Sequence, residues 1–372
     1  MREIGRGTLF AYDDDWSEPI ACSLPADTRD YYDRGGLLPF FQHLAPEGWL
    51  RGLQARAGGT ADQDDFGLLL HYGADCIGAV GVLPLGDEGP VPIDDPDAAA
   101  EAATASGKTL SGVQKKLLAY YDGQHFHPTI KNIDPATYIA KFNRPDLPTL
   151  VQNENLSLTL AREVLGTNEV TRAKPAIVSG LEGIALLVER FDRNGDERLR
   201  LEDFAQILNK PRGNDFRGKY DSSYEEAASV MERFSARARV DLQRFFRLTV
   251  FNLAIGNADA HLKNFSLLER DGELRLSPAY DLINTSIYNF DRETALAIGG
   301  RKRQFEELNR ATLVKLGIDI GLPEPAVQRA LDDIAVRIDK AKSLSFPNHL
   351  NADDFRARYL GVVQDNIGRI FK

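Results

Sequence analysis

The residues best suited to chemistry are three oxygen-bearing side chains, Asp259, Asn264 and Asp281. Asp259 and Asn264 lie in one polar segment, and Asp281 follows after the segment 265–280. A carboxylate such as Asp259 can accept the proton of an attacking hydroxyl. Asn264 and Asp281 offer the kind of oxygen ligands that hold Mg²⁺ on the phosphates of ATP. The set therefore predicts phosphoryl transfer, with ATP and Mg²⁺ as cofactors.

A buried helix and a hairpin are predicted on either side of the polar segment. Apolar residues at helical spacing predict the helix over 242–255, with Asp241 as its N-cap. Asp271-Gly272 predicts the turn of a hairpin that ends before Asp281. Each polar residue alone is more often a solvated loop residue, but protein kinases use this order of helix, loop, hairpin and metal-binding Asp. His261, in the loop, could contact a phosphate or orient the loop, and a structural hydrogen bond explains it about as well.

A lysine in an apolar strand points to the same chemistry. Lys141 lies inside a strand predicted over 137–142, and Glu154 stands in the first turn of a helix predicted over 153–165. A buried ammonium without a partner is strongly destabilising. We therefore predict a Lys141–Glu154 pair like the one that positions the α- and β-phosphates in kinases. The alternative is a lysine whose charged end reaches water.

Two further segments could face a nucleotide. In the segment 109–116, a Ser-Gly turn followed by lysines could close over phosphates, although an ordinary turn explains a single glycine at least as well. The strand predicted over 183–191 ends at Glu189, Arg190 and Phe191, where the main chain of a kinase hinge would bind adenine. The hinge prediction depends only on order along the chain.

The composition restricts the class of protein. The 372 residues are 43% apolar and 27% charged, which suits a folded chain with a sizeable core. The net charge of −10 argues against nonspecific nucleic-acid binding as the main role. Cys22 and Cys76 are the two cysteines, too few for a disulfide framework or a zinc cluster. No apolar run has the length of a signal-peptide core or a membrane span, so we expect a cytoplasmic protein without membrane contact.

The chain divides into four predicted regions. Residues 1–90 mix strands and helices, and residues 91–106 have linker composition. Residues 107–202 alternate strands and turns around one helix, whereas residues 203–372 are mainly helical. The predicted fold class is α+β, a two-lobed protein-kinase-like fold with a mixed N-terminal subdomain and a mostly helical C-terminal lobe.

With these residues in place, the sequence resembles the HipA family of bacterial serine/threonine kinases, the toxins of toxin–antitoxin systems. The motifs that carry the resemblance are Leu38-Pro-Phe-Phe-Gln-His-Leu-Ala-Pro-Glu47, Asp75-Cys-Ile-Gly-Ala-Val80, Ser111-Gly-Val-Gln-Lys-Lys116, Val188-Glu-Arg-Phe-Asp-Arg193, Glu202-Asp-Phe204, Gly256 to Ser266, and Pro278-Ala-Tyr-Asp281. The resemblance implies a two-lobed kinase fold, ATP and Mg²⁺, and protein substrates of the aminoacyl-tRNA synthetase kind. It also implies a helix-turn-helix antitoxin of HipB type that represses the operon, so that DNA is bound only through the antitoxin.

The same resemblance assigns roles by position. Asp259 would be the catalytic base, Asn264 and Asp281 the metal ligands, and Lys141 the phosphate lysine with Glu154 as its structural partner. The other nucleotide-binding positions would be Ser111, Gly112, Val113, Gln114, Lys115, Lys116, Glu189, Arg190, Phe191, His261, Lys263 and Tyr280. Family members switch themselves off by autophosphorylation in the loop before Gly112. Ser111 is therefore the expected acceptor, and Thr109 the second.

The start of the chain departs from the family pattern. Full-length members begin with extra strands, and this sequence starts after them, at about Gly5. We therefore expect a shortened member like the HipT toxins, in which a small HipS-like protein supplies the missing subdomain. Leu9-Phe-Ala-Tyr12 and Ser23-Leu-Pro25 are kept, which indicates a smaller truncation than in those toxins.

The sequence thus predicts an ATP-dependent serine/threonine protein kinase that acts as a toxin. It would phosphorylate an aminoacyl-tRNA synthetase and so inhibit translation, and autophosphorylation would inhibit the kinase itself. One alternative is a catalytically weak binding protein in a transcriptional corepressor complex, but every catalytic position is filled. The other is a small-molecule kinase of the aminoglycoside or choline type, against which the N-terminal segment argues.

Overall fold

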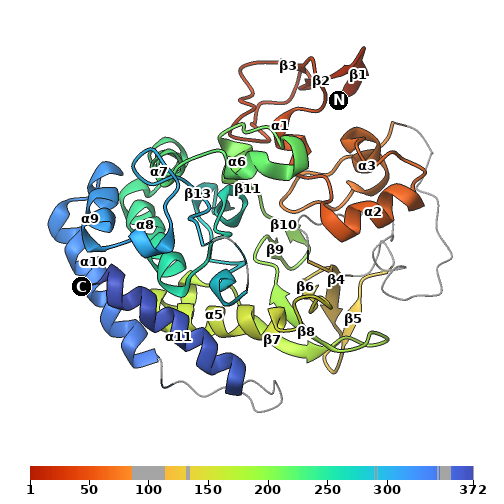
Figure 1. Cartoon of the computed structure of the whole chain (residues 1–372). Helices are drawn as coiled ribbons and strands as arrows, with labels where there is room; N and C mark the ends of the chain where they lie inside the picture. The colour runs from red at the N-terminus through yellow and green to blue at the C-terminus, as the bar shows by residue number, and fades with distance from the viewer. Residues whose placement is uncertain are drawn as a thin grey trace. The chain divides into compact units, whose positions relative to one another are not determined.

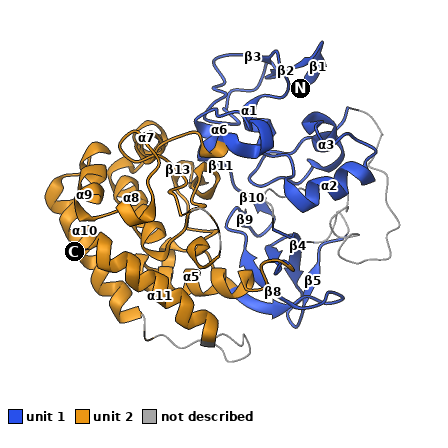
Figure 2. Cartoon of the chain, viewed as in Figure 1, with its two compact units in different colours: residues 1–144, 174–218 blue, residues 145–173, 219–372 orange. Residues whose placement is uncertain are grey.

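The computed structural model describes residues 1–85, 114–130, 135–288, 290, 292–341, 343 and 353–371. The chain forms two compact units, coloured separately in Figure 2. The first unit contains residues 1–144 and 174–218, and the second contains residues 145–173 and 219–372. Helices and sheets are both abundant, so the predicted α+β class is confirmed. Among the described residues, no helix combines the length and the apolar character needed to span a membrane.

The first unit begins with a small antiparallel sheet followed by three short helices. The sheet has the order β1-β2-β3, and its elements and the helices are β1 (Arg2–Ile4), β2 (Gly7–Ala11), β3 (Asp30–Asp33), α1 (Pro39–Gln42), α2 (Gly48–Ala57) and α3 (Asp65–Tyr72). Proline at the start of α1 has the backbone angle that a helical first turn requires. The side chain of Asp64 caps α3 by accepting the Gly67 N–H at 2.8 Å.

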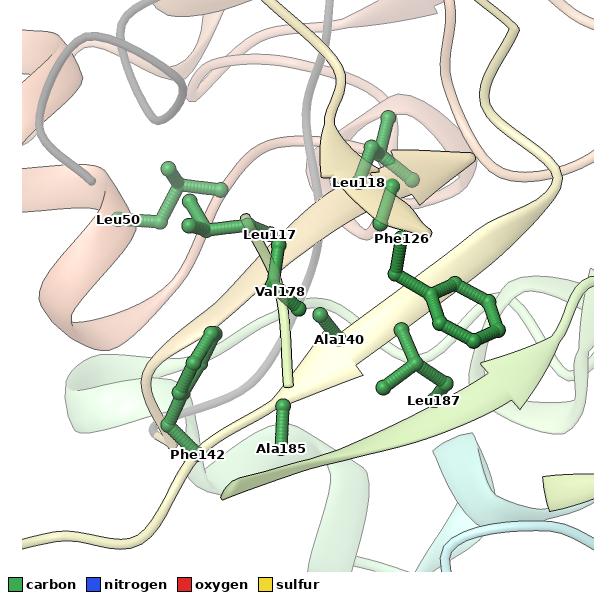
Figure 3. Close-up of a cluster of buried hydrophobic side chains, with 10 residues drawn as sticks. Leu50, Leu117, Leu118, Phe126, Ala140, Phe142, Val178, Ala185 and Leu187 are labelled. Carbon is green, nitrogen blue, oxygen red and sulfur yellow. The ribbon is translucent and has the colours of Figure 1, made fainter. Parts of the chain in front are cut away.

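The first unit also contains a five-stranded sheet. Its order is β5-β4-β6-β8-β7, with β4 (Lys116–Tyr121), β5 (Phe126–Pro128), β6 (Tyr138–Lys141), β7 (Ala173–Ile177) and β8 (Ile184–Glu189). The strands β4, β6 and β8 pair antiparallel, with Leu117 opposite Ala140 and Ala140 opposite Leu187. Figure 3 shows these side chains packed together, with Leu50 of α2 in the same cluster. Helix α2 and the sheet thus share one core, which is why the N-terminal region and the sheet belong to one unit.

Short elements complete the first unit. They are the hairpin β9 (Arg193–Asn194) and β10 (Glu197–Arg198), then β11 (Leu201–Asp203), α6 (Phe204–Ile207) and the start of the 3₁₀ helix η2 (Asn214–Tyr220). Gly195 takes a left-handed φ of 60° between the two strands, which a tight turn requires and glycine allows. A reciprocal capping box between Asp203 and Gln206 starts α6.

The second unit is mainly helical. Its elements are α5 (Leu150–Leu165), η1 (Thr167–Glu169), α7 (Tyr224–Phe234), α8 (Ala238–Ile255), η3 (Leu262–Asn264), β12 (Ser266–Arg270), β13 (Glu273–Leu276), η4 (Thr285–Ile287), η5 (Phe305–Glu307), α9 (Arg310–Asp319), α10 (Glu324–Ala341) and α11 (Asp353–Ile370). Helices α5, α7, α10 and α11 all pack against α8 (Figure 1). Because helices pack against α8 from several directions, apolar residues occupy most of its circumference.

The hairpin after α8 has the predicted turn. Asp271 and Gly272 take φ values of 54° and 75°, which fits a two-residue turn of the kind that Asp-Gly favours. Strands β12 and β13 pair antiparallel on either side of the turn. The chain then runs from the end of β13 to Asp281.

The predicted capping role of Asp241 is wrong. Helix α8 begins earlier, at Ala238, with Arg237 as its N-cap residue. Asp241 is fully buried inside the helix, where it accepts the Leu276 N–H at 2.9 Å and the Ser235 hydroxyl at 2.6 Å. Its carboxylate therefore ties α8 to the end of β13, a long-range role that local sequence patterns do not reveal.

The compact units divide the chain at different points from the predicted regions. Helix α5, assigned from sequence to the region 107–202, belongs to the second unit because it packs against α8 and α10. The predicted linker 91–106 lies outside the described residues. The four-region organisation stays a prediction.

Candidate active site

The polar loop that carries Asp259 begins where α8 ends. Gly256 stops the helix in a left-handed conformation, with φ 77°. The next residue, Asn257, is buried, and its side chain donates to Asn252 Oδ1 at 2.7 Å while accepting the Asp259 N–H at 3.0 Å. The backbone of Asp259 is thus attached to the last turn of a buried helix, and its side chain is exposed.

A second segment also holds this loop through hydrogen bonds. The Thr285 hydroxyl, in η4, accepts the Ala258 N–H at 2.8 Å and donates to the Gly256 carbonyl at 3.1 Å. The Ser286 hydroxyl also donates to the Gly256 carbonyl, at 2.9 Å. The backbone before Asp259 therefore has several hydrogen-bonded anchors, which limits the reorganisation needed during a reaction.

A residue that the sequence did not indicate contacts the proposed base. The Tyr220 hydroxyl donates to Asp259 Oδ1 at 2.5 Å, although the two residues are 39 positions apart. The Tyr220 and His261 rings also meet in an edge-to-face arrangement, with 4.9 Å between the ring centroids. His261 thus packs beside the proposed base, and no short motif could have assigned Tyr220 to this place.

The two predicted metal ligands lie together. Asn264 Nδ2 donates to Asp281 Oδ2 at 3.0 Å, and Asn264 Oδ1 accepts the His261 N–H at 3.1 Å. An amide oxygen has two lone pairs, so this hydrogen bond is compatible with a cation on the same oxygen. Among the described residues no group of three or more His, Cys, Asp or Glu could hold a metal. Mg²⁺ fits the Asn–Asp pair nonetheless, because it commonly binds one or two carboxylates together with water and substrate phosphates.

The position of Asp281 is set by the residues just before it. Ala279 forms a bridge with the segment after α5, since its N–H donates to Glu169 O at 2.8 Å and its carbonyl accepts the Thr171 N–H at 3.0 Å. The Tyr280 hydroxyl donates to the Lys263 carbonyl at 2.8 Å. Tyr280 and Lys263, both predicted to bind nucleotide, thus contact each other within the second unit.

Asp281 itself has an unusual backbone. Its φ of 56° lies in the left-handed region, which non-glycine residues enter uncommonly and which often marks functional sites. The anchored residues before Asp281 hold it in this conformation, with its carboxylate against Asn264.

The described part of the predicted phosphate loop belongs to the first unit. Gln114 Nε2 donates to the Phe142 carbonyl at 2.8 Å. The Lys115 ammonium lies over the rings of Trp49 and Phe142, 5.3 and 5.6 Å from their centroids. Lys116 stands opposite Lys141 in the β4–β6 register. The remaining predicted residues of this loop, Thr109, Ser111, Gly112 and Val113, lie outside the described residues.

Lys141 and Glu154 are both buried. Lys141 is 6% exposed on β6, and Glu154 is 2% exposed on α5. The first residue belongs to the first unit and the second to the second unit. Their pairing therefore stays a prediction.

In the predicted hinge, Arg190 has a structural partner. Its guanidinium donates to Asp192 through Nε at 3.0 Å and through Nη2 at 2.9 Å, and its backbone N–H donates to Thr137 O at 2.9 Å. Asp192 also accepts the Gly78 N–H at 2.8 Å, which attaches the strand end to the N-terminal region. The Arg190 side chain is thus used inside the first unit, and adenine binding by the main chain of Glu189 to Phe191 stays a prediction.

Family comparisons agree with this architecture. A HipA N-terminal domain family matches residues 1–83, and a HipA-like C-terminal domain family matches residues 108–342. The putative kinase Y4dM of Sinorhizobium fredii is 34% identical over 304 residues, which cover 78% of this chain and 72% of the relative. The serine/threonine-protein kinase toxin HipA of Shewanella oneidensis is 28% identical over 367 residues, which cover 89% of this chain and 82% of that protein.

A solved structure extends the likeness to three dimensions. It is the complex of HipA, HipB and operator DNA from Shewanella oneidensis. One of its chains superposes with a TM-score of 0.73 at 26% identity, covering 98% of this chain and 95% of that chain. The C-terminal family match alone spans more than half of the sequence. The chain therefore belongs to the HipA family of kinases.

Proposed function

We propose that this chain is an ATP- and Mg²⁺-dependent serine/threonine protein kinase and the toxin of a toxin–antitoxin pair. The observation that carries the proposal is the placement, within one unit, of an exposed Asp259 on an anchored loop and of the Asn264–Asp281 pair. The relationship to the Shewanella toxin favours a protein substrate over a metabolite.

In the proposed reaction, Asp259 orients the hydroxyl of a target serine and accepts its proton as the serine oxygen attacks the γ-phosphorus. The bond between the γ-phosphorus and the bridging oxygen breaks, and ADP leaves with that oxygen. Hydrogen bonds made by the backbone N–H groups of Ala258 and Asp259 limit movement of the loop during this transfer. Asn264 and Asp281 would hold Mg²⁺, which when bound neutralises negative charge on the transferred phosphoryl group.

The nucleotide-binding residues inferred from the sequence complete the proposal. Lys141, supported by Glu154, would position the α- and β-phosphates. The loop ending at Lys116 would cover the phosphates, and the main chain of Glu189 to Phe191 would bind adenine. His261 and Lys263 would face the phosphates from the loop of Asp259.

The proposed partners follow from the same family. HipA and HipB of Shewanella oneidensis are found together on operator DNA, which supports a HipB-type helix-turn-helix antitoxin for this chain. We further propose an aminoacyl-tRNA synthetase as the substrate, and a HipS-like protein as an additional partner. Co-purification of the chain with the products of its neighbouring genes would identify both small partners.

The test of kinase activity compares the wild-type chain with Asp259→Asn. Wild-type protein with labelled ATP and Mg²⁺ should release ADP and place phosphate on protein. Asp259→Asn should be about 10²–10⁴-fold slower, the usual effect of losing a general base. Asp271→Asn is the matched control, because Asp271 is an exposed turn residue whose left-handed backbone Asn also tolerates. No turnover in wild type would favour a binding protein, and phosphate on choline or an aminoglycoside would favour a small-molecule kinase.

A further inference from the structure

We infer that Tyr220 is a positioning residue that orients the Asp259 carboxylate for proton transfer. The inference rests on the proposed role of Asp259 as the base, and its evidence lies within the second unit. Three observations carry it: the hydrogen bond between the two side chains, the contacts of the Tyr220 ring, and the attachment of the chain beside Tyr220.

The hydrogen bond has one possible direction while Asp259 is ionised. A carboxylate can only accept, so the Tyr220 hydroxyl donates to Oδ1, at 2.5 Å. Hydrogen bonds to charged acceptors are short and stronger than neutral ones. Holding Oδ1 restricts rotation of the carboxylate, and the second oxygen then takes a defined direction. A base must meet the attacking hydroxyl in such a defined geometry.

The Tyr220 ring is held by neighbours of the site. The His261 ring meets it nearly at a right angle, 78° between planes, in an edge-to-face contact. The ammonium groups of Lys302 and Lys219 lie 5.3 and 5.5 Å from the ring centroid, within the range of cation–π attraction. The ring therefore has a built environment that does not depend on the hydroxyl.

The chain on the C-terminal side of Tyr220 is also anchored. Ala297 accepts the Tyr224 N–H at 3.0 Å and donates its own N–H to Ser222 O at 3.0 Å. This bridge places the segment before α7 beside the strand-like segment that leads to Lys302. Tyr220 is thus held through both its ring and its neighbouring backbone, as a positioning residue requires. If Tyr220 merely blocked Asp259 and moved away when substrate bound, neither the ring contacts nor the backbone attachment would be needed.

The test uses the full chain, MgATP, and two substitutions alone and combined. Tyr220→Phe keeps the ring and its contacts but removes the hydroxyl. We expect kcat for ADP release to fall about tenfold or more, the effect of one hydrogen bond to a charged group, with KM for ATP unchanged. In the Asp259→Asn background, Tyr220→Phe should cause almost no further loss, because a residue that acts through Asp259 has nothing left to orient.

Tyr224→Phe is the matched control. Tyr224 is fully buried, and its hydroxyl has no hydrogen-bond partner among the described residues, so its removal should leave kcat unchanged. Circular dichroism and Tm of each variant check that the fold is retained. Unchanged or increased kcat in Tyr220→Phe would overturn the inference, as would an equal loss in both backgrounds. Full turnover in Asp259→Asn would instead show that Asp259 is not the base. The two single variants therefore separate failure of the proposed base from failure of the proposed role of Tyr220.

Discussion

Asn264 donates a hydrogen bond from Nδ2 to Oδ2 of Asp281 at 3.0 Å, although the hairpin β12–β13 lies between them in the chain. The hairpin returns the chain to the loop, and the Ala279 bridge holds the residue two positions before Asp281. Two oxygen-bearing side chains from separate segments therefore meet at one place.

Asp281→Asn should raise the Mg²⁺ concentration needed for activity. The substitution removes one negative charge from the proposed metal site while keeping a residue that tolerates the left-handed backbone. We expect metal affinity to fall by about 10–100-fold or more, by analogy with losses at metal sites in general. A Mg²⁺ titration of ADP release measures the change. Asp365→Asn, at an exposed position on α11, is the control. An unchanged half-maximal Mg²⁺ concentration in Asp281→Asn would show that Asp281 is not a metal ligand.

Ser111 should become phosphorylated in the active protein, with Thr109 as the second acceptor. Phosphate adds about −1.5 to −2 charge, which would repel ATP phosphates or displace the loop. Mass spectrometry of wild type and Asp259→Asn, expressed alike, should find phosphate in wild type and little in the variant. The modified form should also bind ATP more weakly. Active wild-type protein without phosphate at either position would contradict the prediction.

Asp192→Asn should destabilise the first unit. Asp192 is 3% exposed, and burial alone would raise its pKa, but the charges and hydrogen bonds of Arg190 and Arg193 outweigh burial and lower the pKa. Removing one partner of a buried ion network typically costs about 3–5 kcal/mol. Denaturant unfolding at pH 7 measures the loss. Asp196→Asn, in the exposed turn nearby, should change the unfolding free energy by less than about 0.5 kcal/mol.

The loss of unfolding free energy caused by Asp192→Asn should depend on pH. Because the pKa of Asp192 is lower in the folded than in the unfolded chain, its stabilising contribution is fully present above the unfolded value, about 3.9. That contribution disappears as pH falls through the folded pKa. The difference in unfolding free energy between wild type and Asp192→Asn should therefore shrink in acid, and a constant difference would contradict the assigned charge state.

Both cysteines should react slowly in the native protein. Burial raises the pKa of the Cys76 thiol to about 12, and burial together with the negative Glu202 raises the pKa of Cys22. Both thiols are therefore protonated at pH 8, whereas the thiolate is the reactive form. Alkylation by iodoacetamide should be slow in native protein and fast for both residues in guanidinium. Native alkylation as fast as that of unfolded protein would show that a thiol is accessible and ionised.

Much of the candidate site could be predicted from the sequence because its elements depend on local patterns. Apolar residues at helical spacing indicated α8, and Asp271-Gly272 indicated the hairpin turn. The order of these elements then predicted that Asn264 would meet Asp281. The start of α8 was missed, because Asp241 is the kind of residue that caps helices.

Tertiary structure alone decided which distant partners the polar residues have. The sequence does not show that Asp241 accepts a hydrogen bond from the backbone at the end of β13. Nor does it show that Arg190 donates to Asp192 or that the Tyr220 hydroxyl donates to Asp259. Hydrophobic periodicity specifies which face of an element is buried but not which element covers it. A buried carboxylate or hydroxyl takes whatever partner packing brings within hydrogen-bond distance. The sequence by itself therefore determined the helices, turns and reactive residue types, whereas packing of the folded units determined which side chains meet.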